Sequence, residues 1–363
     1  MGLTKSSTGQ SALDKGLRIN KSSSADKIIA LAGNPNVGKS TVFNALTGMK
    51  QHTGNWPGKT VASATGSYST DLCNYILVDV PGTYSLFAHS AEEEVARNFI
   101  CFGDADLTLV VCDATCLERN LNLVLQVTEV SKKTVVCVNL LDEAKRKGIA
   151  VDLEALSKKL GVPVVGTVAQ KKKTLTNLKR TIEKTVAADA TVAKHIKYPD
   201  ILEDAILIVE KAVKDAAGGK ISSRWLALKL IDYDDSLINE INAYLGKNLL
   251  ADESITCAIL EAVEFLKKHG IEKNEVKSIV TSSIFKEAEI SQSVVKVSNG
   301  KYRSADRKID KIVTGKILGF PLMLLMLCFI FWLTITGANY PSALLSSLFS
   351  WLGEKLSIFL GYI

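Results

Sequence analysis

The sequence predicts a mostly parallel α/β domain with helices on both faces of the sheet, then an all-α domain, then a membrane-spanning helix. Strand-like and helix-like segments alternate from residue 27 to about residue 186, as in a parallel sheet with crossover helices. From about residue 187 the strand signals stop, and apolar residues recur at helical spacing. Between Lys316 and Glu354 there is no charged residue, and residues 317–335 are numerous enough to cross a hydrocarbon core.

The first domain contains a phosphate-binding pattern. The run from Gly33 to Ser40, GNPNVGKS, fits G-x-x-x-x-G-K-[ST] and lies between a strand-like run, 27–32, and a helix-like run, 41–46. Its glycines let main-chain N–H groups point at phosphate oxygens, and the dipole of the following helix favours the same negative charge. We expect Lys39 to reach the β- and γ-phosphates and the Ser40 hydroxyl to hold Mg²⁺. The predicted nucleotide contacts of this loop are Gly33, Asn34, Pro35, Asn36, Val37, Gly38, Lys39, Ser40 and Thr41.

Two later sites, each at the end of a strand-like run, indicate which nucleotide is bound. Asp79 is expected to hold a Mg²⁺-bound water, and the N–H of Gly82 to touch the γ-phosphate. Asn139 and Asp142 form the pattern N-x-x-D directly after the strand-like run 134–138. A carboxylate at this place can accept hydrogen bonds from both N1–H and the N2 amino group of guanine. Adenine offers no such donor pair, so the pattern predicts a guanine nucleotide. The last base-contacting loop is expected at Thr167, Val168 and Ala169.

These motifs occur in the order typical of a small GTPase, and the residues between them narrow the family. Residues 52–61, HTGNWPGKTV, lie where a switch I loop belongs. Together with GNPNVGKST and DVPGTYSL, they strongly resemble the GTPase domain of the ferrous-iron transport protein B (FeoB) family. The resemblance continues through a helical segment and residues 305–312 to residues 319–322, GFPL, which are similar to the start of that family's first membrane helix. It covers about residues 27 to 335.

This resemblance implies binding of GTP and GDP with Mg²⁺, and hydrolysis of GTP. Thr60 corresponds to the switch I threonine that closes on Mg²⁺, so Ser40, Thr60 and Asp79 form the expected magnesium set. Thr83 stands where Ras-like enzymes carry a water-positioning glutamine, so we expect slow intrinsic hydrolysis. The expected catalytic residues are Asn36, Lys39, Thr60 and Gly82.

A potassium ion is the second cation that the resemblance implies. In GTPases that resemble this one, K⁺ bound by the phosphate-loop asparagine supplies charge where an arginine finger would. The corresponding residues here are Asn36, with the carbonyl groups of Gly54 and Trp56. An ordinary turn residue is the alternative interpretation of Asn36.

Three features depart from the family pattern. Lys59 occupies a position that is usually apolar, and its ammonium group would compete with K⁺. Val168 replaces a small hydroxyl residue, a change expected to weaken guanine-nucleotide affinity. The chain ends at Ile363, whereas the family continues through a many-helix membrane domain. We therefore expect the permease to be a separate chain or a missing C-terminal domain.

The charge distribution predicts a membrane protein whose GTPase domain is cytoplasmic, and the resemblance implies the cell (inner) membrane. Lysines and arginines gather just before residue 317, whereas Lys355 alone follows, so the positive-inside rule puts the GTPase in the cytoplasm. The net charge of +6 is spread out, so we expect no nucleic-acid partner. The predicted segments are a tail over 1–26, a GTPase domain over 27–186, a helical regulatory domain over 187–290, a basic linker over 291–316, a transmembrane helix over 317–335 and an interfacial amphipathic segment over 341–363.

The expected function is the GTP-binding and GTP-hydrolysing cytoplasmic part of a membrane ferrous-iron uptake system, coupled to a permease. One alternative is a regulatory or assembly GTPase of ribosome-maturation type with a membrane anchor. Such proteins usually carry an RNA-binding module, and none is evident in this sequence. A third interpretation is an incomplete product that hydrolyses GTP without transport. The sequence leaves the Fe²⁺ ligands and homo-oligomer formation open.

Overall fold

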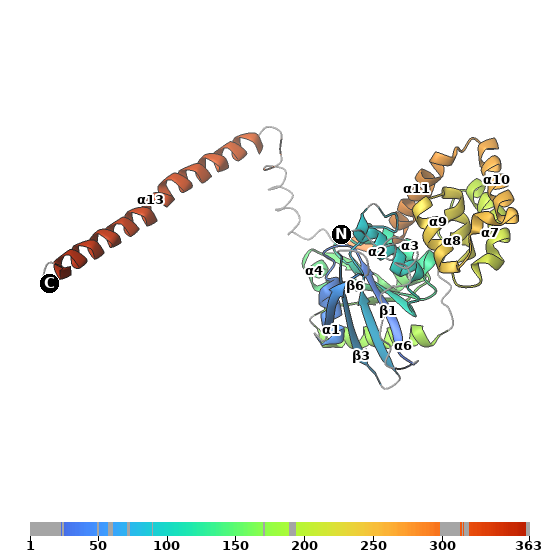
Figure 1. The fold of residues 1–363 in the computed structure, drawn as a ribbon, viewed down its shortest axis with the longest axis horizontal. Helices are drawn as coiled ribbons and strands as arrows, with labels where there is room; N and C mark the ends of the chain where they lie inside the picture. The colour runs from blue at the N-terminus through green and yellow to red at the C-terminus, as the bar shows by residue number, and fades with distance from the viewer. Residues whose placement is uncertain are drawn as a thin grey trace, which may run out of the picture. The chain divides into compact units, whose positions relative to one another are not determined.

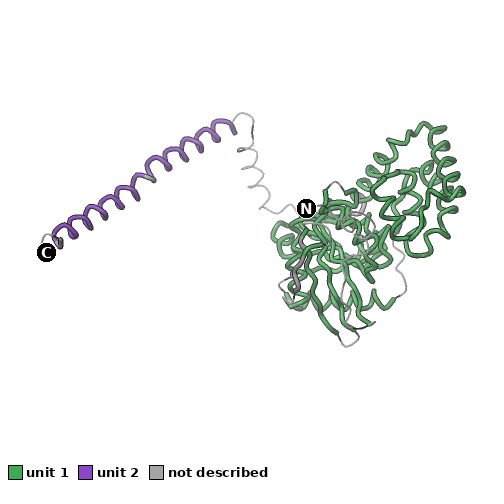
Figure 2. The backbone as a smooth tube through the Cα atoms, viewed as in Figure 1, with its two compact units in different colours: residues 1–298 green, residues 299–363 purple. Residues whose placement is uncertain are grey.

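The computed structural model describes residues 23, 25–48, 51–56, 61–70, 73–88, 90–169, 171–188, 194–297, 313, 315 and 319–360. The chain divides into two compact units, residues 1–298 and residues 299–363 (Figure 2). The first unit contains the sheet and the helices that follow it. The described part of the second consists mainly of one long helix. The predicted switch I residues Lys59 and Thr60 lie outside the described residues.

A seven-stranded sheet with the order β2-β3-β4-β1-β5-β6-β8 forms the centre of the first unit (Figure 1). The pairs β2–β3 and β3–β4 are antiparallel, and the other neighbours are parallel. This confirms the predicted mostly parallel sheet, whose parallel strands all end at one edge. The strands are β1 (Lys27–Gly33), β2 (Gln51–Asn55), β3 (Ala62–Ser69), β4 (Asn74–Asp79), β5 (Leu107–Asp113), β6 (Thr134–Asn139) and β8 (Val164–Gly166).

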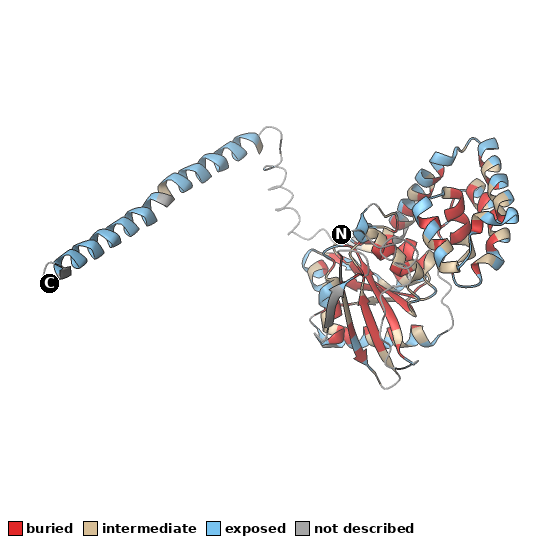
Figure 3. Ribbon diagram, viewed as in Figure 1, coloured by how far each residue is buried: buried red, intermediate tan, exposed pale blue. Residues whose placement is uncertain are grey.

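Helices cover both faces of the sheet, and the strand β1 shows why. Ile29 and Leu31 pack into a core with helices α1 and α6, whereas Ile28 and Ala30 belong to a core that includes α2 and α3. Successive side chains of a strand point to opposite faces, so a strand covered on both faces must be apolar throughout. Figure 3 shows the central strands β1, β4, β5 and β6 buried along most of their length. The helices are α1 (Lys39–Thr47), α2 (Ala91–Phe102), α3 (Leu117–Val130), α4 (Leu141–Arg146), α5 (Leu153–Leu160) and α6 (Lys172–Ala187).

A helical bundle follows the sheet and shares its core. Helix α11 packs against α3, and one buried cluster runs from Val124 of α3 to Trp225 and Ile238 in the bundle. The two domains therefore bury apolar surface against each other, which stabilises their contact. The elements of the bundle are α7 (Asp200–Ala217), α8 (Ser223–Asp232), α9 (Asp235–Leu245), the 3-10 helix η2 (Leu249–Ala251), α10 (Glu253–Lys268) and α11 (Lys273–Gln292).

After α11 the chain returns to the GTPase domain. Strand β9 (Val295–Val297) pairs antiparallel with β7 (Ile149–Val151), and the Asp152 N–H donates to the Val294 carbonyl at 3.3 Å. From the sequence we predicted a basic linker over residues 291–316. The structure differs because Val295 and Val297, which flank Lys296, are β-branched and favour a strand.

The second unit contains α13 (Gly319–Leu360), a single helix. By length and composition it is long and apolar enough to cross a membrane over Gly319–Ile358. We expected two segments separated near Pro341, but the helix continues through that residue. Because proline lacks an N–H, it removes one bond, the one to the carbonyl of Gly337, and the apolar sequence continues on both sides.

Candidate guanine-nucleotide site

The phosphate loop joins β1 to α1 through a tightly packed turn. Asn36 and Gly38 both have left-handed backbone conformations, with φ of 66° and 80°. A Cβ atom on Gly33 would lie 2.7 Å from the Val111 carbonyl oxygen, and one on Gly38 would lie 2.6 Å from Nδ2 of Asn139. Both glycines are therefore required by close packing, and the pattern read from the sequence forms a loop at the carboxyl edge of the sheet.

Lys39 begins α1 and lies against the end of β4. Its Nζ donates to the Asp79 carboxylate and to the Val80 carbonyl. The Lys39 and Asp79 side chains are 12% and 18% exposed, so each partly desolvated charge has a partner. The two groups expected to act on the γ-phosphate and on magnesium thus lie side by side.

The residues described here fit a magnesium ion. Ser40 is exposed on the first turn of α1, directly after Lys39, and Asp79 ends β4. A hydroxyl and a carboxylate are oxygen donors of the kind that Mg²⁺ prefers. The third predicted ligand, Thr60, is outside the described residues.

The segment after Asp79 lies against the phosphate loop. A Cβ on Gly82 would lie 3.3 Å from both N and Cγ of Pro35, and the Thr83 N–H donates to the Gly33 carbonyl at 3.2 Å. Thr83 is 1% exposed, and its hydroxyl donates to the Ser85 carbonyl at 2.6 Å. Its side chain therefore turns inward, where it cannot orient an attacking water.

Asn139 connects three of the predicted loops. It is 1% exposed; its Nδ2 donates to the Val37 carbonyl at 3.2 Å, and its Oδ1 accepts from the Thr167 hydroxyl at 3.2 Å. Thr167 is fully buried, and its N–H donates to the Val138 carbonyl at 2.7 Å. The Thr167 side chain, expected to be in a base-contacting loop, thus positions Asn139.

Asp142 lies in the first turn of α4, after Leu140 in a left-handed conformation with φ of 60°. Asp142 is exposed, and within the described residues its carboxylate has no ion pair or hydrogen bond. In the last loop, the Thr174 hydroxyl accepts from the Val168 N–H at 3.3 Å, and Ala169 is buried in the core. Sequence reasoning missed Thr174, whose only signal is a hydroxyl residue at the start of α6.

The predicted switch I loop is partly a strand. Residues 51–55 form β2, in which Gly54 pairs in register with Ser63 of β3. Trp56 is buried; its N–H donates to the Val61 carbonyl at 2.8 Å, and its ring lies edge-on to Phe99 at 5.2 Å. Asn36 is exposed on the phosphate loop. The potassium donors proposed from the sequence therefore comprise one exposed amide and two main-chain carbonyls of this hairpin.

Two residues of α3 that the sequence analysis did not single out support these loops. The Arg119 carbonyl accepts from Nδ2 of Asn34 at 3.3 Å, and its guanidinium lies 4.3 Å from the centre of the Tyr84 ring. Gln126 Oε1 accepts from the Leu86 N–H at 2.8 Å. A spacing of seven places both residues on one face of α3, the only sequence signal that could have found them.

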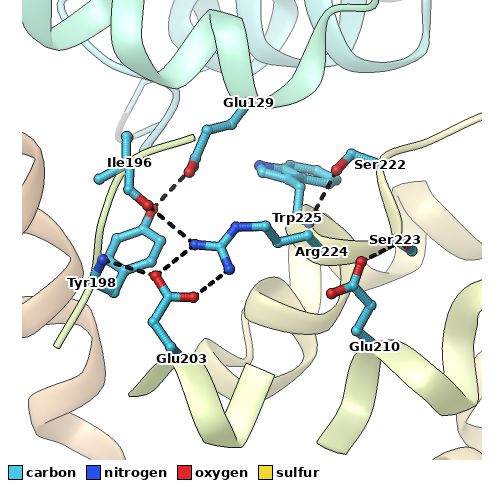
Figure 4. Close-up of polar contacts among 9 residues, drawn as sticks. All are labelled: Glu129, Ile196, Tyr198, Glu203, Glu210, Ser222, Ser223, Arg224 and Trp225. Carbon is cyan, nitrogen blue, oxygen red and sulfur yellow. Dashed lines mark hydrogen bonds and ion pairs between the residues drawn. The ribbon is translucent and has the colours of Figure 1, made fainter. Parts of the chain in front are cut away.

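At its C-terminal end, α3 contacts the helical domain through a polar network (Figure 4). Glu129 accepts from the Tyr198 hydroxyl at 3.0 Å, and Arg224 Nη2 donates to Glu203 at 2.9 Å and to the Ile196 carbonyl at 3.1 Å. Burial raises the pKa of the Glu129 carboxyl to about 7, although the hydrogen bond from Tyr198 and the charge of Arg224 oppose that rise. Near pH 7 the carboxyl is therefore divided between its protonated and its ionised form.

Fold and site together define a P-loop nucleotide-binding domain of the GTPase class, followed by a helical domain. Residues 27–182 match the family described as ferrous iron transport protein B, and residues 198–296 match the FeoB cytosolic helical domain. The chain belongs to the ferrous iron transport protein B family.

Individual relatives agree with this assignment. The Fe(2+) transporter FeoB of Salmonella typhimurium is 32% identical over 319 residues, which cover 86% of this chain and 39% of the relative. A Porphyromonas gingivalis Fe(2+) transport protein A/FeoB fusion protein is 31% identical, with 92% and 40% covered. The chain thus spans about two fifths of the length of these curated relatives.

Solved structures of related cytosolic domains match about three quarters of the chain. The cytosolic domain of the T. maritima FeoB iron transporter in its GMPPNP form has a TM-score of 0.62 and 32% identity, covering 74% of this chain and 99% of that one. An S. thermophilus NFeoB mutant bound to GDP has a TM-score of 0.61 and 30% identity, with 74% and 99% covered.

Proposed function

We propose that this chain binds and hydrolyses GTP as the cytoplasmic part of a membrane ferrous-iron uptake system. The observation that carries the proposal is the side chain of Asn139, which ties the phosphate loop at Val37 to the last loop at Thr167. Asp142, three residues later, presents a free carboxylate beside these loops, within the described residues. Related cytosolic domains have been solved with GDP and GMPPNP, which supports the same ligand class here.

The chemistry needs positioning and neutralisation of charge more than covalent catalysis. Lys39 and the main-chain N–H of Gly82 would contact the γ-phosphate. Ser40, Thr60 and Asp79 would hold Mg²⁺, which neutralises phosphate charge when bound. Lys39 would then divide its hydrogen bonds between nucleotide and Asp79. Because Thr83 is turned inward, hydrolysis is slow unless K⁺ at Asn36, Gly54 and Trp56 supplies further charge.

Coupling to the membrane would run through the segment after Asp79. The Leu86 N–H donates a hydrogen bond to Gln126 of α3. The Phe87 ring lies 4.5 Å from Nζ of Lys229 and 5.9 Å from Nζ of Lys277, both in the helical domain. A nucleotide-dependent shift of this segment would change contacts made by α8 and α11. The helical domain would transmit the change to α13 and to a permease, with the GTPase domain in the cytoplasm.

The iron-uptake half of the proposal rests on family membership. Residues 198–296 match the FeoB helical domain, which favours this function over a ribosome-maturation GTPase. We infer transport, the permease and the ferrous ion as substrate from the Fe(2+) transporters to which the chain is similar.

Phosphate release from GTP by the full chain in detergent tests the enzymatic half. We expect slow hydrolysis that is faster in K⁺ than in Na⁺, and none above background in Lys39→Ala. Release that is equal in wild type and Lys39→Ala would refute hydrolysis at this loop. Equal rates in the two salts would remove K⁺ from the mechanism and leave the rest intact.

A further inference from the structure

A cavity of about 300 Å³ lies between the segment after Gly82 and the helical domain. Its walls come from residues 86–88, from α2, from α8 and α9 with the residues that connect them, and from α11. None of its lining residues belongs to the phosphate loop or to the base-contacting loops. The volume is at the lower end of the range for small-molecule sites in proteins.

Arg97 of α2 lines this cavity and is 3% exposed. Its Nε donates to Oδ1 of Asn98 at 3.1 Å. Within the described residues, its two terminal nitrogens have no hydrogen-bond acceptor, and no carboxylate lies within 4.0 Å of them. A largely buried guanidinium without a counter-charge is unfavourable, because no partner offsets the loss of its hydration. The cavity thus presents a charge that favours an anion.

The carboxylates of the cavity are already engaged. Asp234 caps α9 by accepting from the N–H groups of Ser236 at 3.0 Å and Leu237 at 3.3 Å. Asp232 pairs with Nζ of Lys229 at 3.5 Å. The lining residues therefore carry three cations, Arg97, Lys229 and Lys277, against two carboxylates, and three minus two leaves one positive charge.

We propose that this cavity binds a phosphate-type oxyanion, held by Arg97 with Lys229 and Lys277. A guanidinium can donate two parallel hydrogen bonds to such a group, and the two ammonium groups add charge without fixing geometry. The free ion and the phosphoryl end of a small ester share this chemistry. Because residues 86–88 form one wall, the bound anion would hold that segment against the helical domain, a consequence that rests on the proposed function.

Calorimetric titration of the full chain in detergent tests the binding. Inorganic phosphate and glycerol phosphate are the two probes, at constant ionic strength set with chloride. One set of titrations uses wild type with saturating GDP, and a second set uses Lys39→Met. In both sets the phosphate loop is prevented from binding the added phosphate. Tighter binding of the inorganic ion identifies free phosphate as the ligand, and tighter binding of glycerol phosphate identifies an ester.

Arg97→Met and Lys277→Met should each weaken binding by about tenfold or more, because each removes a charged hydrogen-bond donor. Arg180→Met, an exposed change on α6, should leave binding unchanged and serves as the matched control. Lys277 is also exposed, so its variant keeps the fold even where the Arg97 variant does not. Absence of binding by wild type, or equal binding by the Arg97, Lys277 and Arg180 variants, would overturn the proposal. GDP binding, measured separately, reports on the nucleotide site alone.

Discussion

Replacing Glu129 by glutamine should change how the stability of the first unit depends on pH. Glu129 is half-buried, and its pKa is raised from an ordinary value near 4.5 to about 7. Burial is the largest cause of the rise. Lys229 and Arg224 of α8, the Tyr198 hydroxyl and the Ile196 N–H face the carboxyl and oppose it. Between about pH 4.5 and pH 7, Glu129 is therefore protonated in the folded state and ionised in the unfolded state.

The sign and size of the effect follow from this difference. Over that window the free energy of unfolding falls as pH rises, because Glu129 is unfavourable to ionise where α3 meets the helical domain. A change of two to three pKa units corresponds to about 3 kcal/mol. Glutamine keeps the acceptor for the Tyr198 hydroxyl without a charge. Glu129→Gln should match wild type near pH 5 and exceed it near pH 8, by roughly 5 to 10 °C in Tm.

Thermal unfolding of the full chain between pH 5 and pH 8 measures this effect. Glu261→Gln, at an exposed position on α10, is the matched control and should follow wild type throughout. If Glu129→Gln shows the same pH dependence as wild type, then Glu129 is ionised at little cost, and the inferred burial of its carboxyl is wrong.

Two further changes test the nucleotide site. Asn139→Ala removes the buried hydrogen bonds to the Val37 carbonyl and the Thr167 hydroxyl. In a calorimetric titration it should weaken GDP binding by about ten- to a hundredfold, or about 1 to 3 kcal/mol. Unchanged affinity would mean that other contacts hold the loops. Thr83→Gln should lower Tm and fail to speed GTP hydrolysis, because the Thr83 side chain is 1% exposed and points away from solvent. A faster and stable variant would show that this position faces the nucleotide.

Local patterns were sufficient to predict the phosphate loop and most of the elements. Residues 33–40 could be placed between a strand and a helix because glycine requirements and apolar periodicity are local properties of the chain. The predicted parallel sheet followed from the same alternation. In the helical domain, apolar residues at helical spacing predicted helices without strands, and α7 to α11 are helices.

Features that depend on tertiary packing were not predictable. The Thr167 hydroxyl turns inward and donates to Oδ1 of buried Asn139, a contact between the ends of two strands that no single segment reveals. Strand β9 forms only because β7 offers it an edge about 145 residues earlier in the chain. In the sequence, Arg97 is an ordinary polar position on a helix. In the structure it is 3% exposed and lines a cavity with residues of the helical domain, a burial that no single segment reveals. Pro341 signals a break, but a proline inside a long apolar helix costs only one hydrogen bond and some strain.

Nucleotide selectivity tests the central claim most directly, namely that Asp142 chooses the purine for the loop around Lys39. GDP, ADP and xanthosine diphosphate are titrated into the full chain with Mg²⁺, in wild type and in Asp142→Asn. We predict that wild type prefers GDP to ADP by about a hundredfold or more, and that the variant loses GDP and gains xanthosine diphosphate, because an amide can donate to the 2-oxo group. Equal binding of GDP and ADP by wild type, or a variant that keeps its preference for GDP, would contradict the account.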